Sequence, residues 1–224
     1  MLAVHLLSTA LTLPSLKADF RLLSARCDRG FTANAATISK LQSMAADLEA
    51  MATADANQTF APTASDDLLG KWYLDFCDAG DVLSLALIPL PLGARLGPIY
   101  QSVAADTSSA DAFVVQNGCE FIPPGAFSGI VDSAKTVYEV EARCRTLDDT
   151  RVSLAFVGGR IQPPLLPALG AVLPDALIEQ VQGLFAERVY LETTYLDEDM
   201  RIGRGPGREL YVLSKRPGAG SADL

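Results

Sequence analysis

The sequence predicts a mainly β (α+β) domain in which an antiparallel β-barrel follows an N-terminal helical segment. Apolar residues recur at helical spacing up to Met51, and from Leu69 onward they alternate with polar residues, as in strands with one buried face. The length of 224 residues suits one large domain with its own hydrophobic core. We therefore expect one domain over residues 17–216, helical over 17–52 and forming the barrel over 69–216.

The two ends of the chain are expected to lie outside this domain. Residues 1–16, MLAVHLLSTALTLPSL, resemble the apolar core of a signal peptide, but they lack a basic region and an A-x-A cleavage motif. We interpret them as a leader or targeting remnant, with a plain disordered end as the alternative. Residues 217–224 are predicted to form a disordered tail.

Two helices are predicted between Lys17 and Met51, because a turn at Asp28-Arg29-Gly30 separates two apolar stretches. Asn34 has the side chain of a good N-cap and precedes the second stretch. The apolar residues that share one face of this second helix are Ile38, Leu41, Met44, Ala45 and Leu48. Residues 52–67 are rich in Ala, Thr, Asp and Pro and are expected to form a linker.

The strand region alternates apolar and polar residues in segments such as KWYLDFC, TVYEVEARC and RVSLAFV, with short polar turns between them. About eight such strands that close on themselves would make a small barrel, whose interior either fills with side chains or holds one small ligand. The candidate ligand-lining residues share the inward faces of these segments and are Trp72, Leu74, Phe76, Tyr138, Val140, Leu154 and Phe156. Trp72 is interpreted first as a core anchor and second as a ligand contact.

Two apolar segments, Val82–Pro98 and Ile161–Pro174, contain prolines that bar them from central strands. They are either a cap over the barrel mouth or exposed loops that contact lipid or a partner. The candidate membrane-contact residues in them are Leu85, Leu87, Ile88, Leu90, Leu165, Leu166 and Leu169. No uncharged run reaches the ~18–20 continuous apolar residues of a spanning helix, so we expect no transmembrane span.

The charge balance excludes several partners. The chain carries 27 acidic and 18 basic residues, for a formal net charge of −9, and has no cluster of Lys and Arg. A nucleic-acid-binding protein needs a basic surface, and anionic lipid headgroups repel an acidic protein. Any membrane contact is therefore expected to be hydrophobic and directed at neutral lipid.

Metal sites and nucleophilic catalysis are not expected either. The only histidine is His5, and the four cysteines lie far apart without a C-x-x-C motif, so the patterns of zinc sites and of Ser-His-Asp or Cys-His systems are missing. We expect the cysteines to be small buried hydrophobes, with Cys119 and Cys144 as the pair to check for a disulfide. The prediction is that there is no catalytic residue, no metal and no cofactor.

The densest local signal is Thr193–Lys215, TTYLDEDMRIGRGPGRELYVLSK. Its G-R-G-P-G run is not a phosphate-binding loop, because a strand pattern follows it instead of a helix. We expect these glycines to form a tight hairpin at positions of positive φ. The carboxylates of Asp197, Glu198 and Asp199 are interpreted as structural groups, with Arg201 and Arg204 as their charge partners, rather than as an acid–base pair.

The same segment resembles the C-terminal signature of the plastid lipid-associated proteins, the fibrillins. Three other stretches match that family in order: RLLSARCDRGF, LLGKWYLDF and LGPIYQSVAADTSSADAFVVQNGCEF. The resemblance covers roughly Leu16 to Arg216, and the apolar insertion at Leu83–Leu92 departs from it. The residues assigned to the family motif are Tyr195, Asp197, Asp199, Arg201, Gly203, Arg204 and Gly205.

The resemblance implies a lipocalin-like barrel in a non-enzymatic protein of the plastid (chloroplast), associated with plastoglobules or thylakoids. Such a protein binds or organises lipids, carotenoids or prenylquinones and lies peripherally on a neutral lipid or thylakoid surface. It would need no cofactor other than a bound lipid, carotenoid or prenylquinone. The alternative is a protein–protein scaffold with a packed barrel that docks on a photosynthetic or prenylquinone-biosynthesis complex.

Overall fold

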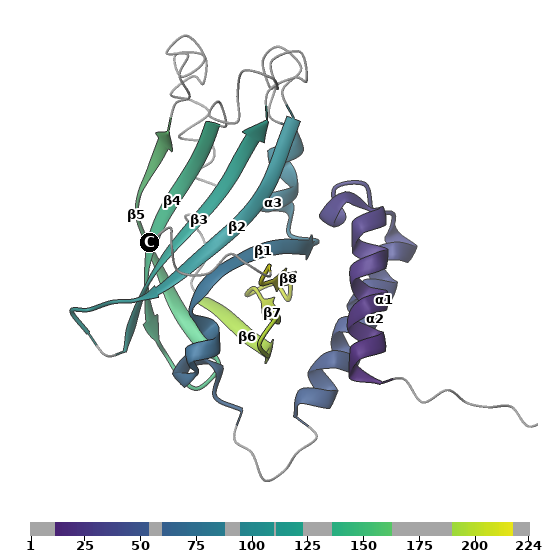
Figure 1. Ribbon diagram of the computed structural model, residues 1–224, viewed down its shortest axis with the longest axis horizontal. Helices are drawn as coiled ribbons and strands as arrows, with labels where there is room; N and C mark the ends of the chain where they lie inside the picture. The colour runs from purple at the N-terminus through teal and green to yellow at the C-terminus, as the bar shows by residue number, and fades with distance from the viewer. Residues whose placement is uncertain are drawn as a thin grey trace, which may run out of the picture.

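The computed structural model describes residues 12–53, 60–87, 95–109, 111–122, 136–162 and 190–216, and only the backbone at 136, 156 and 159–162. Over these residues, two long helices precede an eight-stranded barrel (Figure 1). The helices are α1 (Leu13–Arg26), α2 (Ala35–Ala52) and the short α3 (Gly80–Leu83). The strands are β1 (Gly70–Cys77), β2 (Arg95–Ala105), β3 (Ala112–Ile122), β4 (Thr136–Thr146), β5 (Arg151–Gln162), β6 (Tyr190–Leu196), β7 (Met200–Arg204) and β8 (Leu210–Ser214).

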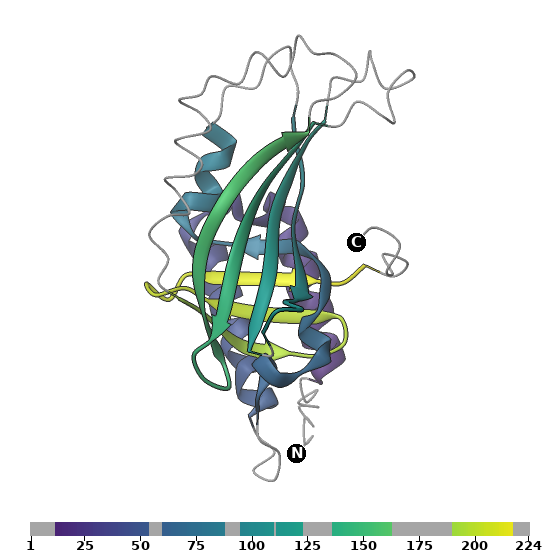
Figure 2. The same ribbon diagram turned by 90° about the vertical axis from the view of Figure 1, so that its left-hand side faces the viewer.

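Each strand pairs antiparallel with the next, and β1 pairs with β8 to close the barrel. The long strands β2–β5 form one tall wall, and the shorter β1 and β6–β8 cross it at a steep angle (Figure 2). The predicted fold class, a mainly β antiparallel barrel preceded by helices, is confirmed. The alternation did not predict β7 as a separate strand, because all five of its residues are buried and the sequence therefore lacks a polar face there.

The first strand changes the side toward which its apolar residues point. Trp72 and Leu74 belong to the cluster inside the barrel, as predicted. The pairing with β8 shifts register between Leu74 and Phe76, and such a bulge redirects the next side chain. Phe76 therefore packs outside the barrel against Phe20 of α1, with ring centroids 6.1 Å apart. Its predicted place in the interior is corrected accordingly.

The helical hairpin begins earlier than predicted and turns where predicted. α1 begins at Leu13, with Thr12 as N-cap, so residues 13–16 are helical. The interpretation of residues 1–16 as a leader or targeting remnant stays a prediction. Asn34 caps α2 by accepting the Thr37 backbone N–H at 2.9 Å, as the sequence predicted. Between the helices, Gly30 has φ of +108°, and a Cβ there would lie 2.0 Å from the Cys77 carbonyl oxygen. The turn therefore requires glycine.

The two helices lie along the outside of β1 and β6–β8 (Figure 1). We call the apolar contact between the two helices and these strands the outer interface. Its buried members are Leu16, Phe20, Cys27, Leu41, Ala45, Leu48, Phe76, Tyr195, Met200, Ile202, Leu210 and Val212. Neither of the two long helices, nor any other helix in the described part of the chain, is long and apolar enough to cross a bilayer.

Candidate functional site

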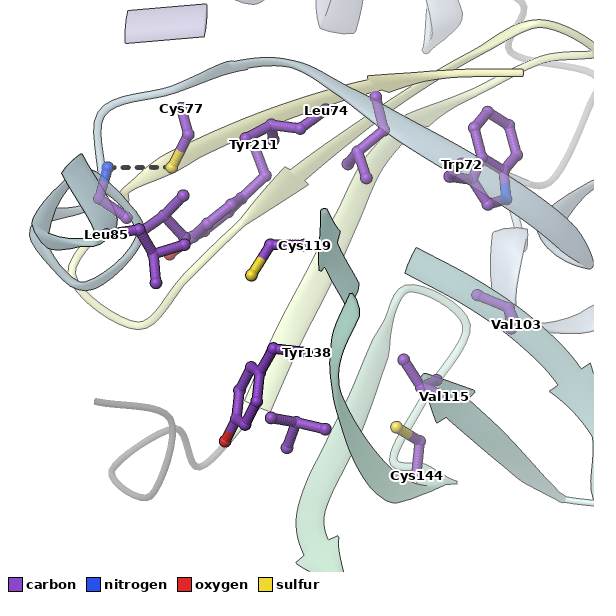
Figure 3. Packing of buried hydrophobic residues seen from close by; sticks show 14 of the residues in the cluster. Trp72, Leu74, Cys77, Leu85, Val103, Val115, Cys119, Tyr138, Cys144 and Tyr211 are labelled. Carbon is purple, nitrogen blue, oxygen red and sulfur yellow. Dashed lines mark hydrogen bonds between the residues drawn. The ribbon is translucent and has the colours of Figure 1, made fainter. Parts of the chain in front are cut away.

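The barrel interior holds a cavity of about 80 Å³. Most of its wall is apolar, and its described residues come from β1–β4 and β6–β8, together with α3 and the turn that follows it. The lining residues are Leu74, Val82, Leu85, Ile99, Tyr100, Gln101, Asn117, Gly118, Cys119, Tyr138, Val140, Leu191, Arg201, Tyr211 and Leu213. The rest of the interior is filled by side chains, including Trp72, Val103, Val115 and Cys144 (Figure 3).

Three of the predicted ligand-lining residues, Leu74, Tyr138 and Val140, line this cavity. Trp72 lies in the filled end, fully buried, with its Nε1–H donating to the Leu68 carbonyl at 2.9 Å. Leu154 is partly buried and packs against the same apolar cluster. Phe156 lies on β5, but its side chain is outside the described residues. These residues thus lie along one part of the cavity wall and in the packed end beside it, and their contact with a ligand stays a prediction.

Arg201 is the most unusual residue of the interior. Its side chain points inward from β7, lines the cavity and is only 3% exposed. One of its terminal nitrogens donates to the Gln101 side-chain oxygen, and its guanidinium carbon lies 5.1 Å from the centre of the Trp72 ring. Burial lowers the pKa of Arg201 to about 10, so the group stays charged at neutral pH. No carboxylate of the described residues forms an ion pair with it.

Two other polar groups of the cavity, the Tyr138 hydroxyl and the Cys119 thiol, are neutral donors. The Tyr138 hydroxyl is buried, and no described residue is in hydrogen-bonding position to it. Burial raises the pKa of Tyr138 to about 12 and that of the Cys119 thiol to about 12. Neither group ionises near neutral pH, so neither acts readily as a base or nucleophile there. The cavity can therefore hold an apolar group and donate hydrogen bonds to an acceptor oxygen attached to that group.

Arg204, three residues after Arg201, faces the helices instead. Its guanidinium donates to both carboxylate oxygens of Glu49 on α2, at 2.9 and 3.1 Å, and to the Gln42 side-chain oxygen at 2.6 Å. Gln42 in turn donates to Asp78, which accepts the Leu210 backbone N–H at 2.7 Å. This network attaches α2 to the end of β1 and to the β7–β8 hairpin. The sequence offered no sign of Gln42 or Glu49, because both lie far from the motif along the chain.

A second charged cluster attaches α1 to the turn between β6 and β7. Lys17 donates to Asp197 at 2.8 Å and also to Asp199, while Arg21 contacts Asp199 at 3.1 Å. The Tyr195 hydroxyl donates to Asp197 as well. The carboxylates are thus structural, but their partners come from α1, and the expected partners Arg201 and Arg204 are corrected. Burial would raise the pKa of Asp197, but the hydrogen bonds from Lys17, Tyr195 and the backbone outweigh it and lower that pKa.

The β7–β8 hairpin forms as predicted, although for a different reason. The positive φ in the turn belongs to Arg208, at 67°, and not to a glycine. A Cβ on Gly205 or Gly207 would lie within 2.5 Å of the Glu209 carboxylate, the movable end of a flexible side chain, so neither position strictly requires glycine. Gly203 pairs with Thr193 of β6 inside the sheet.

The apolar segment after β1 divides into a buried and an exposed part. Leu85 is 4% exposed and lines the cavity, so its side chain is not available at the surface. Leu87, two residues later, is 82% exposed. The other candidate membrane-contact residues lie outside the described residues, namely Ile88, Leu90, Leu165, Leu166 and Leu169.

The cysteines and the metal-binding side chains complete the chemistry of the described residues. Cys27, Cys77, Cys119 and Cys144 are all buried and none forms a disulfide, so Cys119 and Cys144 are not joined. Cys77 accepts the Ala79 backbone N–H at 3.2 Å, as Figure 3 shows. No group of three or more His, Cys, Asp or Glu side chains in the described ranges could hold a metal ion.

Known proteins resemble this chain over most of its length. The family model described as PAP_fibrillin matches residues 16–214, which confirms the resemblance stated from the sequence motifs. One relative, the probable plastid-lipid-associated protein 2, chloroplastic, of Arabidopsis thaliana, is 28% identical over 84% of this chain and 66% of its own length. Plastoglobulin-1, chloroplastic, of Pisum sativum is 30% identical over 83% of this chain and 56% of its own length. The chromoplast-specific carotenoid-associated protein of Cucumis sativus is 28% identical over 84% of this chain and 63% of its own length. The match thus spans about two thirds or less of each of these relatives.

Proposed function

The chain belongs to the PAP_fibrillin family, and from this premise we propose that it is a non-enzymatic, peripheral lipid-associated protein of the plastid. It binds or organises lipids, carotenoids or prenylquinones at a plastoglobule or thylakoid surface. Family membership carries the proposal, since relatives bear names such as plastid-lipid-associated protein, plastoglobulin and carotenoid-associated protein. The apolar cavity inside the barrel supports it, because it offers a place for part of a lipid.

The size of the cavity limits how the protein would hold lipid. Small-molecule pockets typically enclose roughly 300–1,000 Å³, whereas this cavity has about 80 Å³. A whole carotenoid or acylglycerol does not fit inside, so contact would be made mainly at the surface, with one end of a molecule in the barrel. Leu87, exposed beside the cavity wall, is the described residue best placed for this contact.

We propose that Leu87 acts together with Ile88, Leu90, Leu165, Leu166 and Leu169 in lying on neutral lipid. Each buried leucine contributes roughly 1.5–3 kcal/mol, so a few suffice for reversible binding. The test is flotation of the purified protein with triacylglycerol particles coated with neutral galactolipid. We expect the protein to float, to float equally in high salt because the contact is apolar, and to sink when Leu87→Asp and Leu90→Asp are combined.

Leu147→Asp is the matched control for that experiment. Leu147 is an exposed leucine in the turn between β4 and β5, at the other end of the long strands (Figure 2). Its substitution should leave flotation unchanged. Absence of flotation in the unsubstituted protein, or its loss in modest salt, would count against surface association.

The small cavity also favours one alternative, a scaffold that docks on a photosynthetic or prenylquinone-biosynthesis complex. The filled end around Trp72 is what a packed barrel would look like. Organic extraction of natively purified protein followed by mass spectrometry separates the two functions. A stoichiometric lipid or pigment supports the lipid-associated function, and an empty barrel with a co-purifying subunit supports the scaffold.

A further inference from the structure

Arg201 brings a positive charge into the barrel, and no residue that the structure describes places an anion beside it. A buried charge is costly unless it is paired, and most buried guanidinium groups have a carboxylate partner, as Arg204 has Glu49. Within the described ranges Arg201 has only the neutral Gln101 oxygen and the face of Trp72. A second cation, Lys215, lies 4.6 Å from the centre of the same Trp72 ring, which adds to the positive potential there.

Two hydrogen-bond donors of the cavity also find no acceptor in the described part of the chain. The Arg201 Nε–H and the Tyr138 hydroxyl are both buried, and neither has a hydrogen-bond partner among the residues that the structure describes. Both residues line the same cavity. Buried donors are almost always paired in folded proteins, so two in one cavity point to a ligand that supplies acceptor oxygens.

The remaining wall determines what else the ligand must carry. Leu74, Val82, Leu85, Val140 and Leu213 make the cavity mostly apolar. Its volume of about 80 Å³ admits a small polar head and the first carbons of a chain, but not a whole lipid. The ligand must therefore join an oxygen-rich, negatively charged head to an apolar chain that continues out of the cavity.

We propose that the barrel binds the carboxylate of an unesterified fatty acid, with Arg201 as its counter-ion and Tyr138 as a donor to the head or to the atoms next to it. The proposal deepens the lipid-associated function, and it rests on that function only in assuming that lipid reaches the barrel. Charge-assisted hydrogen bonds to a buried guanidinium contribute more than neutral ones, so an acid should be preferred over its neutral analogues.

The chain has a single tryptophan, which lies against Arg201, so its fluorescence reports on the site. Sodium decanoate and decan-1-ol, both below their aggregation limits, are titrated into the full chain at neutral pH, with calorimetry as a second readout. We expect decanoate to bind at least about tenfold more tightly than decanol. In Arg201→Met, the preference should fall to about twofold or less, with decanol binding unchanged. Tyr138→Phe should weaken decanoate binding less than Arg201→Met does.

Arg208→Met is the control matched for net charge. Arg208 is exposed on the same hairpin and forms a surface ion pair with Glu192 at 3.2 Å. The Arg208→Met variant should keep the full preference for decanoate over decanol. Arg201→Lys, which retains the charge, should restore part of that preference, a result that a purely structural role of Arg201 does not predict.

The proposal is overturned if the unsubstituted protein binds decanoate and decanol equally, binds neither, or retains its preference in Arg201→Met. Acetate is a further control, because an anion site without an apolar wall would bind acetate as tightly as decanoate. Equal affinity for acetate and decanoate would therefore also overturn the proposal. Arg201→Met should float with neutral lipid like the unsubstituted protein. If neither the unsubstituted protein nor any variant floats, the surface function is contradicted. If the unsubstituted protein floats but shows no preference for the carboxylate, only this inference is contradicted.

Discussion

Arg201 and Arg204 lie on the same short strand and are nearly equally buried, at 3% and 5% exposure, yet they sit in opposite environments. Arg204 faces the outer interface, where α2 supplies Glu49 and Gln42 for a complete network. Arg201 faces the interior, where it meets a neutral amide and an aromatic ring. At the outer interface α2 thus satisfies the Arg204 guanidinium and is held to the barrel by it, whereas no described residue of the interior accepts from the Arg201 Nε–H or the Tyr138 hydroxyl.

The largest effect on the outer interface is expected from a substitution at Gly30, in the turn between α1 and α2 that packs against the end of β1. In Gly30→Ala, the new Cβ would collide with the Cys77 carbonyl oxygen at a φ that only glycine adopts easily. We expect a loss of at least about 4 kcal/mol in the free energy of unfolding, measured in urea. Gly80→Ala, beside the cavity, meets open space and should change stability by less than about 0.5 kcal/mol. Equal effects at both positions would contradict the contrast in packing.

Truncation of apolar side chains compares the packing of the two regions directly. Phe20 is fully buried against Phe76 in the outer interface, so Phe20→Ala should cost about 4 kcal/mol of unfolding free energy. Leu85 already borders an empty space, so Leu85→Ala should cost only about 2 kcal/mol, at the low end for such changes. A thermal or urea unfolding series reports both. A larger loss for Leu85→Ala would mean that the interior is packed as tightly as the interface.

Replacing each arginine by methionine sharpens the comparison further. Arg204→Met leaves the Glu49 carboxylate without its cation in a mostly buried place and should cost about 3 kcal/mol. Arg201→Met removes a charge that has no ionic partner among the described residues, so its stability should be unchanged or higher by about 1 kcal/mol. Urea denaturation of both variants at neutral pH is the measurement. Similar losses in the two would indicate an anionic partner for Arg201 within the fold.

The smallest expected effect is a pH dependence at the attachment of α1. The folded-state pKa of Asp197 is lowered, so its contribution is present above the unfolded carboxyl pKa, ~3.9, and is lost as pH falls through the folded value. Burial raises the pKa of Asp75, whose contribution has the opposite sign. The difference between the unsubstituted protein and Asp197→Asn isolates Asp197. That stability difference should shrink below about pH 4 and be constant near neutrality, and a difference that grows in acid would reverse the assigned sign.

The fold could be predicted well from the sequence because both of its periodicities are local. The alternation in β1, β4 and β5 and the cap at Asn34 depend only on neighbouring residues. β7 could not be recognised, since a strand buried on both faces has no alternation of apolar and polar residues. The prediction that Phe76 points into the barrel was wrong, because the alternation does not reveal the β-bulge that redirects its side chain. The partners of Asp197 and Arg204 come from α1 and α2, and long-range pairing of this kind leaves no trace in residue spacing.

The pairing of β1 with β8 has a consequence for the synthesis and maturation of the chain. The first strand must wait for the last one, so the sheet presents two open edges until the whole domain has emerged, and such edges invite association with other chains. Closure also depends on contacts between residues far apart in sequence, which makes folding slow. A protein shortened before Leu210 would keep Tyr138 and Arg201 but would lose Tyr211 and the strand that closes the barrel. We expect such a protein to be bound by chaperones and degraded by proteases rather than to bind lipid.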